Sequence, residues 1–428
     1  MSRIIVAGLL IFLLVITGLI AFRGEVVALA VPLALYLLAG LYWGPDKLQL
    51  EVNRTLSLER VSPGDPATIT LEVKNLGAPL ENLLLEDFPG GLTIITGSPR
   101  KLVSLKRGET FTWSYTVKGK RGHYPLSYLR ASARDLLGLV ERVEEIPTRG
   151  QLFILPAAPR VRRIAIRPRR TRVYAGSIPA RIGGPGIEFF GVREYQPGDP
   201  QHWINWRASA RYSNSIYSNE FEQERVADVG IILDGRRVIN ELGSGRTIFE
   251  HSVLAATSLA DGFLAAGNRV GLLVYGKHVN WTYPGYGKLQ REKILQSLAR
   301  ADLGESQVFS GLIIPRRLFP AYSQMVLVSP LESGDFEGLV RFRSAGFQLI
   351  VVSPDPVSYE VNSLPESNGA SLAARIVRIE REILLHRLQR TGIQVVNWNT
   401  ALPFENVIQG ALSRPPAWLK AIHSGGVG

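Results

Sequence analysis

The chain has 428 residues, no cysteine and a formal net charge of +12 at pH 7. This length accommodates two or three domains that each bury a core, and the lack of cysteine excludes disulfides, thiolate metal sites and cysteine nucleophiles. The positive charge favours anionic partners such as phospholipid headgroups, nucleic acid or the acidic face of another protein.

Two apolar runs begin the chain, Ile4 to Phe22 and Val26 to Trp43, with Arg23-Gly24-Glu25 between them. As helices that rise about 1.5 Å per residue, both are long enough to cross a hydrocarbon core of about 30 Å. They predict a two-helix transmembrane hairpin over residues 1–44. A cleaved signal peptide is the alternative, although its apolar region is normally shorter and has no second span directly behind it. The basic residues flanking the hairpin favour a multi-pass protein of the cell membrane with cytoplasmic soluble domains.

Residues 45–150 alternate between apolar and polar side chains, with turns at short intervals. The strings ATITLEVKN (Ala67–Asn75) and ETFTWSYTVKG (Glu109–Gly119) show this period of two, and clusters of Gly, Pro and Asn separate such strings. The pattern predicts a small antiparallel, immunoglobulin-like (Ig-like) β-sandwich domain.

Residues 151–183 form a basic linker by composition. Seven arginines lie between Arg160 and Arg172, and Pro159 and Pro168 disfavour a continuous helix. One interpretation is a solvated connecting arm; the other is contact with anionic lipid, where each basic residue adds about 1 kcal/mol. Nucleic acid is an unlikely partner because no finger, RRM or dimeric heptad motif accompanies the charge. The candidate lipid-facing residues are Arg162, Arg163, Arg167, Arg169 and Arg170.

Residues 184–225 contain a strand, a tight turn at Pro197-Gly198-Asp199 and a short helix that continues to about Arg211. The string G-V-R-E-Y-x-P-G-D-x-x-x-x-I-N-W-R-A-S-A-R, from Gly191 to Arg211, resembles the signature of the domain of unknown function 58 family. The resemblance implies a membrane-anchored von Willebrand A-like protein that works with a MoxR-like AAA+ ATPase.

The polar residues of this signature segment have two interpretations. Their opposite charges satisfy each other and hold the neighbouring domains at a set angle, or Arg193, Arg207 and Arg211 form a docking patch, since arginine and tryptophan often anchor protein interfaces. The candidate residues are Arg193, Glu194, Tyr195, Gly198, Asp199, Asn205, Trp206, Arg207 and Arg211.

Apolar strand-like runs alternate with amphipathic helical runs in residues 226–428. This rhythm predicts a mainly parallel sheet covered by helices on both faces, which is the Rossmann-like layer arrangement that von Willebrand A-like domains share.

The resemblance implies a metal site at the end of the first strand of this domain, where the pattern is D-x-S-x-S. Here the string is Asp234-Gly235-Arg236-Arg237-Val238, so Arg236 and Val238 stand at the hydroxyl positions. A cationic side chain repels the hard divalent ion that oxygen ligands attract. We therefore expect a degenerate site at Asp234 with no metal, and no cofactor elsewhere.

Together these features predict a membrane-anchored interaction module or adaptor, not an enzyme, that works with a MoxR-like ATPase in assembly or maturation of client complexes. Two alternatives stay open. One is a metal-dependent adhesion protein with an ion at Asp234; the other is a hydrolase that uses Glu194 or Asp199 as acid or base.

Overall fold

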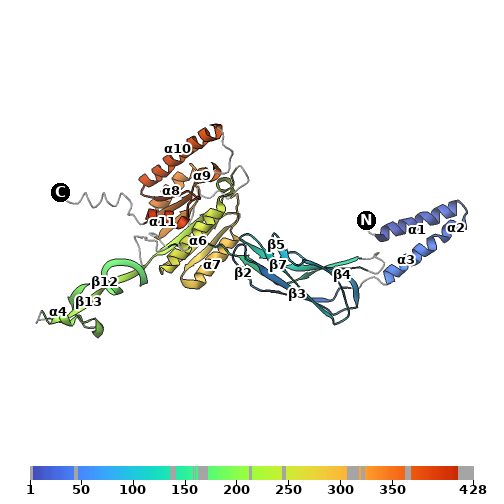
Figure 1. The fold of residues 1–428 in the computed structure, drawn as a ribbon, viewed down its shortest axis with the longest axis horizontal. Coiled ribbons are helices and arrows are strands. Elements are labelled where there is room, and N and C mark those ends of the chain that lie inside the picture. Colours follow the sequence, from blue (N-terminus) through green and yellow to red (C-terminus); the bar gives the residue numbers. More distant parts are fainter. Residues whose placement is uncertain are drawn as a thin grey trace. The chain divides into compact units, whose positions relative to one another are not determined.

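The computed structural model describes residues 3–42, 47–134, 141–157, 159, 161, 172–211, 215–242, 247–305, 318–319, 323–361 and 368–412. The chain divides into two compact units, Met1–Leu155 and Pro156–Gly428, which are described separately (Figure 1).

The apolar N-terminal runs form α1 (Arg3–Ile20), α2 (Gly24–Ala28) and α3 (Ala30–Tyr42). None of the helices in the described residues has the length and apolar character needed to cross a membrane. At 1.5 Å per residue α1 is about 27 Å long, and the second run is divided at Leu29, which leaves α3 about 20 Å long, against a core of about 30 Å. The predictions of a transmembrane hairpin and of a multi-pass location in the cell membrane with cytoplasmic domains were therefore wrong.

Among its described residues, unit 1 has two four-stranded sheets, of order β1-β3-β7-β5 and β10-β9-β4-β6, and a small sheet β2-β11-β8. Neighbouring strands are antiparallel except β2 and β11, which are parallel. The strands are β1 (Leu50–Leu56), β2 (Arg60–Val61), β3 (Ala67–Asn75), β4 (Leu80–Asp87), β5 (Thr93–Thr96), β6 (Arg100–Leu105), β7 (Thr110–Lys118), β8 (Gly122–Pro125), β9 (Tyr128–Arg134), β10 (Glu141–Pro147) and β11 (Gln151–Ile154).

The two larger sheets of unit 1 share one hydrophobic core. Ile69, Leu71 and Val73, at alternate positions of β3, are fully buried and belong to the same cluster as Leu83 and Leu129 from the other sheet. Side chains of a strand alternate between the faces of the sheet, so every second residue is available to this core. The arrangement is consistent with the β-sandwich that the alternating pattern predicts.

The described part of unit 2 contains a six-stranded sheet of order β16-β15-β14-β17-β18-β19. All neighbours are parallel except β16, which runs antiparallel to β15. In chain order this is 3-2-1-4-5-6, the order of a doubly wound α/β sheet. The strands are β14 (Asp228–Asp234), β15 (Arg269–Tyr275), β16 (Val279–Gly285), β17 (Gln324–Val328), β18 (Gln348–Pro354) and β19 (Gln394–Trp398).

Helices cover both faces of this sheet (Figure 1). Ile231 and Leu233 of β14 pack with residues of α6, α7 and α11, whereas Ile232 belongs to the cluster that contains residues of α8 and α10. Both faces are buried, which explains why every residue of β14 is buried. The helices of unit 2 outside the signature segment are α5 (Arg237–Asn240), α6 (Phe249–Ala265), α7 (Gly287–Arg300), α8 (Asp335–Ser344), α9 (Pro356–Val361), α10 (Asn368–Arg390) and α11 (Phe404–Leu412).

A two-stranded ribbon precedes the sheet in the chain. It consists of β12 (Arg172–Glu194) and β13 (Tyr217–Val226), which pair antiparallel with several register shifts. Between them lie the 3-10 helix η1 (Gln201–Trp203) and α4 (Trp206–Ser209). The signature segment therefore forms the end of this ribbon.

Candidate functional site

The order of the sheet in unit 2 reverses between β14 and β17. In doubly wound sheets, ligands bind in the crevice at the carboxyl ends of the two strands at this switch point. Asp234 ends β14 and Ser329 directly follows β17, and both are buried. The serine hydroxyl donates a hydrogen bond of 2.8 Å to Oδ2 of Asp234. This position is where a ligand of the α/β unit would be expected.

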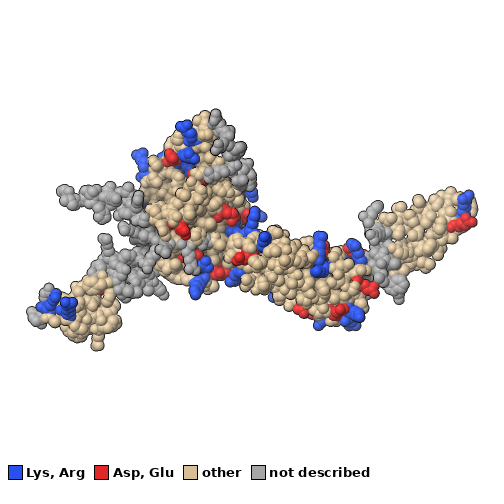
Figure 2. Space-filling model, viewed as in Figure 1, with Lys and Arg blue, Asp and Glu red and all other residues tan. Residues whose placement is uncertain are grey.

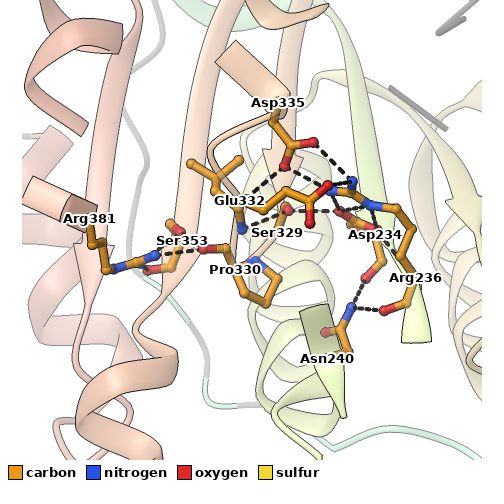
Figure 3. Close-up of polar contacts among 10 residues, drawn as sticks. Asp234, Arg236, Asn240, Ser329, Pro330, Glu332, Asp335, Ser353 and Arg381 are labelled. Atoms are coloured by element: carbon orange, nitrogen blue, oxygen red, sulfur yellow. Dashed lines mark hydrogen bonds and ion pairs between the residues drawn. The ribbon is translucent and has the colours of Figure 1, made fainter. Parts of the chain in front are cut away.

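The guanidinium of Arg236 lies at this switch point (Figure 3). Its Nε donates to Oδ1 and Oδ2 of Asp234, both at 3.1 Å, and its Nη2 donates to Oδ2 at 2.8 Å. The backbone N–H of Arg236 also donates to Asp234 Oδ1, at 3.0 Å. Both oxygens of the Asp234 carboxylate thus accept hydrogen bonds from Arg236, two positions further along the chain.

The opposite edge of the same guanidinium faces the first turn of α8. Nη1 and Nη2 donate to the two carboxylate oxygens of Asp335 at 2.9 and 2.8 Å, and Nη1 lies 3.4 Å from Oε1 of Glu332. Burial lowers the pKa of the Arg236 guanidinium, but the hydrogen bonds to Asp234 and Asp335 outweigh it, so the net shift is upward. Arg236 therefore stays charged. Its guanidinium forms buried ion pairs with Asp234 at the end of β14 and with Asp335 in the first turn of α8.

Local backbone geometry directs Arg236 into the crevice. A Cβ on Gly235 would lie 2.6 Å from the backbone oxygen of Tyr275, so only glycine fits between Asp234 and Arg236. The side-chain amide of Asn240 donates to the backbone oxygens of Asp234 and Arg236 at 3.0 and 2.9 Å. These contacts hold the turn after β14 in place.

The residues at this site do not fit a divalent cation. Both buried carboxylates already face the guanidinium, which supplies the positive charge that a metal would otherwise supply. Among the described residues there is no group of three or more His, Asp or Glu side chains that could hold a metal ion.

A second buried arginine lies at the neighbouring strand ends. Arg381 of α10 donates to the backbone oxygen of Pro330 at 2.6 Å, to Oγ of Ser353 at 2.9 Å and to Oδ1 of Asn397 at 3.0 Å. Burial lowers the pKa of this guanidinium, and Asp355 opposes that effect. Figure 3 shows the contacts of the two arginines at the ends of β14, β17 and β18, and the hydrogen bond from Arg381 to Asn397 extends them to β19.

The sequence pattern identified Arg236 as a departure from the metal motif and predicted a degenerate site at Asp234. It did not anticipate Asp335 as the second partner of Arg236, and it missed Arg381. The sequence shows Arg381 only as an arginine among the apolar residues of a helical pattern. Such a pattern does not indicate which residues the arginine contacts.

Within the signature segment, Arg193 and Asp199 form an ion pair with Nη2 and Oδ1 2.6 Å apart. Arg193 Nε also lies 3.6 Å from Oε1 of Glu220 on β13. The turn between the two partners includes Gly198 at φ +111°, a conformation that favours glycine. The hydrogen bond from Arg193 and a second from the backbone of Gln196 lower the pKa of the Asp199 carboxyl.

Asn205 connects the short helix α4 to the ribbon. Its Oδ1 accepts from the backbone N–H of Ala208 at 2.9 Å, which caps the helix, and its Nδ2 donates to Oδ1 of Asn219 at 2.7 Å. The hydroxyl of Tyr195 donates to the backbone oxygen of Asp199 at 3.3 Å. These residues are engaged in holding the ribbon end together.

Three other residues of the segment point to solvent. The side chain of Trp206 is 71% exposed, and Arg207 and Arg211 are also exposed. Figure 2 shows basic side chains gathered at this end of the ribbon, near α4. We call Trp206, Arg207 and Arg211 the ribbon tip. Glu194 is exposed as well, and its backbone oxygen accepts a hydrogen bond of 3.0 Å from Arg193.

The five candidate lipid-facing arginines of the linker lie outside the described residues. They are Arg162, Arg163, Arg167, Arg169 and Arg170.

Taken together, the fold and the site define a chain with a β-sandwich-like unit and a doubly wound α/β unit whose switch point is filled by arginine. Residues 191–354 match the model of the family described as "Protein of unknown function DUF58". This match includes the ribbon end, Arg236 and the strands up to β18.

One curated relative is "Uncharacterized protein YeaD" from Bacillus subtilis (strain 168), with 26% identity over 255 residues. The alignment covers 58% of this chain and 61% of the relative, so the chain spans less than two thirds of that protein.

Solved structures show weak likenesses to parts of the chain. A CARDB domain from Pyrococcus furiosus, solved in complex with di-metal ions, is 18% identical, with 26% of this chain and 96% of that chain covered, at a TM-score of 0.20. The alpha-2-macroglobulin of E. coli is 24% identical, with 29% of this chain and 8% of that chain covered, at a TM-score of 0.19. Scores this low carry no argument about this chain.

Proposed function

We propose that this chain is a protein-interaction module that acts by binding rather than by catalysis. In this proposal the α/β unit carries no metal, and an adaptor surface at the ribbon tip contacts the partner. The observation that carries the proposal is the position of Arg236. Its guanidinium bonds both buried carboxylates at the switch point, where a nucleotide or metal would otherwise bind.

Two sets of contacts argue against the metal-dependent adhesion protein and against a hydrolase in which Asp199 is the acid. A metal-dependent adhesion protein needs free oxygen ligands at Asp234, and these oxygens accept hydrogen bonds from Arg236 and Ser329. A hydrolase that uses Asp199 as its acid needs a carboxyl that holds its proton near neutral pH. The pKa of Asp199 is instead lowered by its hydrogen bond to Arg193.

The ribbon tip has the side chains of an interface anchor. Tryptophan and arginine are the residue types whose truncation most often weakens protein complexes. Trp206 is 71% exposed although burying its ring would remove a large apolar surface from water. Arg193 and Asn205, by contrast, are committed to contacts within the segment. This contrast separates a docking role for the tip from a structural role for the residues beneath it.

The proposed partner is a MoxR-like AAA+ ATPase, and the proposed role is an adaptor in the assembly or maturation of client complexes. The resemblance of the signature segment to the domain of unknown function 58 family supports this choice. The basic tip suits an acidic face on the ATPase.

The test is the affinity of the purified full chain for a purified MoxR-like ATPase from the same organism, measured by biolayer interferometry. Trp206→Ala and Arg207→Ala are each expected to weaken binding at least tenfold, whereas Leu289→Ala, which truncates an exposed residue of α7, is the matched control and leaves binding unchanged. A chelator is expected to have no effect, because Arg236 takes the place of a metal.

Three outcomes would count against the proposal. If the wild-type chain does not bind the ATPase, the partner is wrong. If the Trp206 and Arg207 variants bind as the wild type does, the docking surface is wrong. If treating this chain alone with EDTA, before it meets the ATPase, abolishes binding, the metal-independent function is wrong.

A further inference from the structure

The C-terminal half of helix α10 packs against the α/β unit along one face, whereas residues 371–380 are exposed or half-buried. Leu384, Leu385 and Leu388 are buried with Arg381, and the helix contacts β19, α8 and α9. Figure 1 shows α10 at the periphery of unit 2. The spacing of these buried residues keeps them on one side of the helix.

The opposite face of α10 is apolar and exposed. Leu372, Ile376, Ile379 and Ile383 are 59, 51, 57 and 55% exposed. At 3.6 residues per turn, these four lie about half a turn around the helix from the buried residues. Burying such side chains removes apolar surface from water, so a water-facing row of four favours association. We call these four residues the α10 seam.

The spacing within the seam identifies the kind of surface that would cover it. Successive seam residues are four, three and four positions apart. This spacing matches the 3.5-residue repeat of a coiled coil over the twelve residues from Leu372 to Ile383. Ile376 and Ile383 then take the a positions, and Leu372 and Ile379 take the d positions. Isoleucine at a with leucine at d favours a two-helix pair, whereas isoleucine at both positions favours three or four helices. The seam thus fits at least one further helix.

We propose that the partner helix is α10 of a second copy of this chain, in parallel orientation. Arg375 flanks the seam on one side and Glu380 on the other, and both are exposed. In a parallel pair, each flanking residue faces the residue five positions further along the other helix. Arg375 therefore faces Glu380 of the second copy, and Glu382 faces Arg387, whose guanidinium also lies 4.2 Å from the centre of the Phe336 ring in its own copy. All four contacts of the symmetric pair join opposite charges.

The two-fold pair is compatible with the rest of unit 2. Because the seam lies opposite the buried face, the two α/β units lie on the outer sides of the helix pair. The inference is independent of the proposed function, and either can fail without the other.

Sedimentation equilibrium of the full chain tests the proposal. The wild type is expected to form a dimer at micromolar concentration, and Ile379→Glu is expected to raise the dissociation constant at least a hundredfold. Leu289→Glu, an equally drastic change at an exposed position of α7, is the control and leaves the dimer intact. Circular dichroism of each variant checks that the fold is retained.

Cysteine variants and charge-reversal variants test the register. Because the chain has no cysteine, Ile383→Cys introduces a single thiol, which a parallel pair brings next to its counterpart. Mild oxidation should give a disulfide-linked dimer, and Leu289→Cys should not. Arg375→Glu should weaken the dimer about tenfold, and adding Glu380→Arg should restore it.

The proposal is overturned if the wild type is still a monomer at a protein concentration of about 100 µM. It is also overturned if Ile379→Glu leaves a dimer intact, since the contact would then lie elsewhere, for instance on the apolar helices of unit 1. Equal cross-linking of the Ile383 and Leu289 cysteine variants would exclude the parallel register.

Discussion

Replacing Arg236 by methionine tests whether this residue holds the switch point together. The substitution keeps much of the aliphatic length but removes the guanidinium. Asp234 and Asp335, whose side chains are 1 and 2% exposed, would then be left without their cationic partner. Removing one partner of a buried ion pair costs about 3–5 kcal/mol, because the remaining charge is buried and uncompensated.

The free energy of unfolding is best measured locally, because the chain has two units. Hydrogen exchange of peptides from β14 and β17, followed by mass spectrometry across a urea series, reports on the α/β unit alone. The matched control is Arg237→Met, which removes the adjacent arginine. Its ion pairs with Glu241 and Glu305 are exposed to solvent, so the expected loss is much smaller.

The effect of Arg236→Met depends on pH. Burial raises the pKa of the Asp234 carboxyl, and in the variant the guanidinium no longer opposes this rise. A carboxyl with a raised folded-state pKa stabilises the fold below its unfolded pKa of about 3.9, and this stability is lost as pH rises through the folded-state value. The difference between wild type and variant should therefore grow from acidic to neutral pH.

A compensating variant separates charge from packing. Adding Asp234→Asn and Asp335→Asn to Arg236→Met removes the buried negative charges and should recover most of the lost stability. The reasoning is refuted if Arg236→Met costs no more than Arg237→Met at pH 8, or if the triple variant is less stable than the single one.

Three further predictions concern the site and the ribbon. Arg236→Ser should create Mn²⁺ binding, detected by calorimetry, because it exchanges a cation for a hydroxyl beside two carboxylates; equal binding by the wild type would contradict this. Asn205→Ala should destabilise the ribbon end by about 1 kcal/mol through loss of the α4 cap, seen as faster local hydrogen exchange, and Asn205→Asp should retain the cap. In an NMR titration the Asp199 carboxyl should titrate below its ordinary range, and Arg193→Ala should raise its pKa. If the pKa of Asp199 is the same in the variant, the ion pair with Arg193 is not the cause of the lowered pKa. Because the Asp199 pKa is lowered in the fold, its stabilising contribution is present above the unfolded pKa and is lost on acidification.

Local patterns in the sequence were sufficient for individual elements. The alternation in residues 67–75 corresponds to β3, whose buried residues recur at every second position. The uniformly apolar run before Asp234 corresponds to β14, buried on both faces. Such patterns are reliable because the period of side-chain burial follows directly from the geometry of each element.

Hydropathy was not sufficient at the N-terminus. The run from Val26 to Trp43 has the composition of a single span, but the structure divides it into α2 and α3 at Leu29. Composition describes how apolar a segment is, whereas the length of an unbroken helix depends on backbone geometry at each residue.

By itself, the sequence determined that no thiol chemistry is available, that apolar strands and amphipathic helices alternate after residue 226, and that an arginine stands two positions after Asp234. Only the tertiary structure decided what that arginine does. Asp335 is 99 positions away from Arg236 in the chain, and the parallel pairing of β14 with β17 brings the two side chains into bonding distance. The partners of a buried charge are set by which strands become neighbours, and that depends on the packing of the whole sheet rather than on any local pattern.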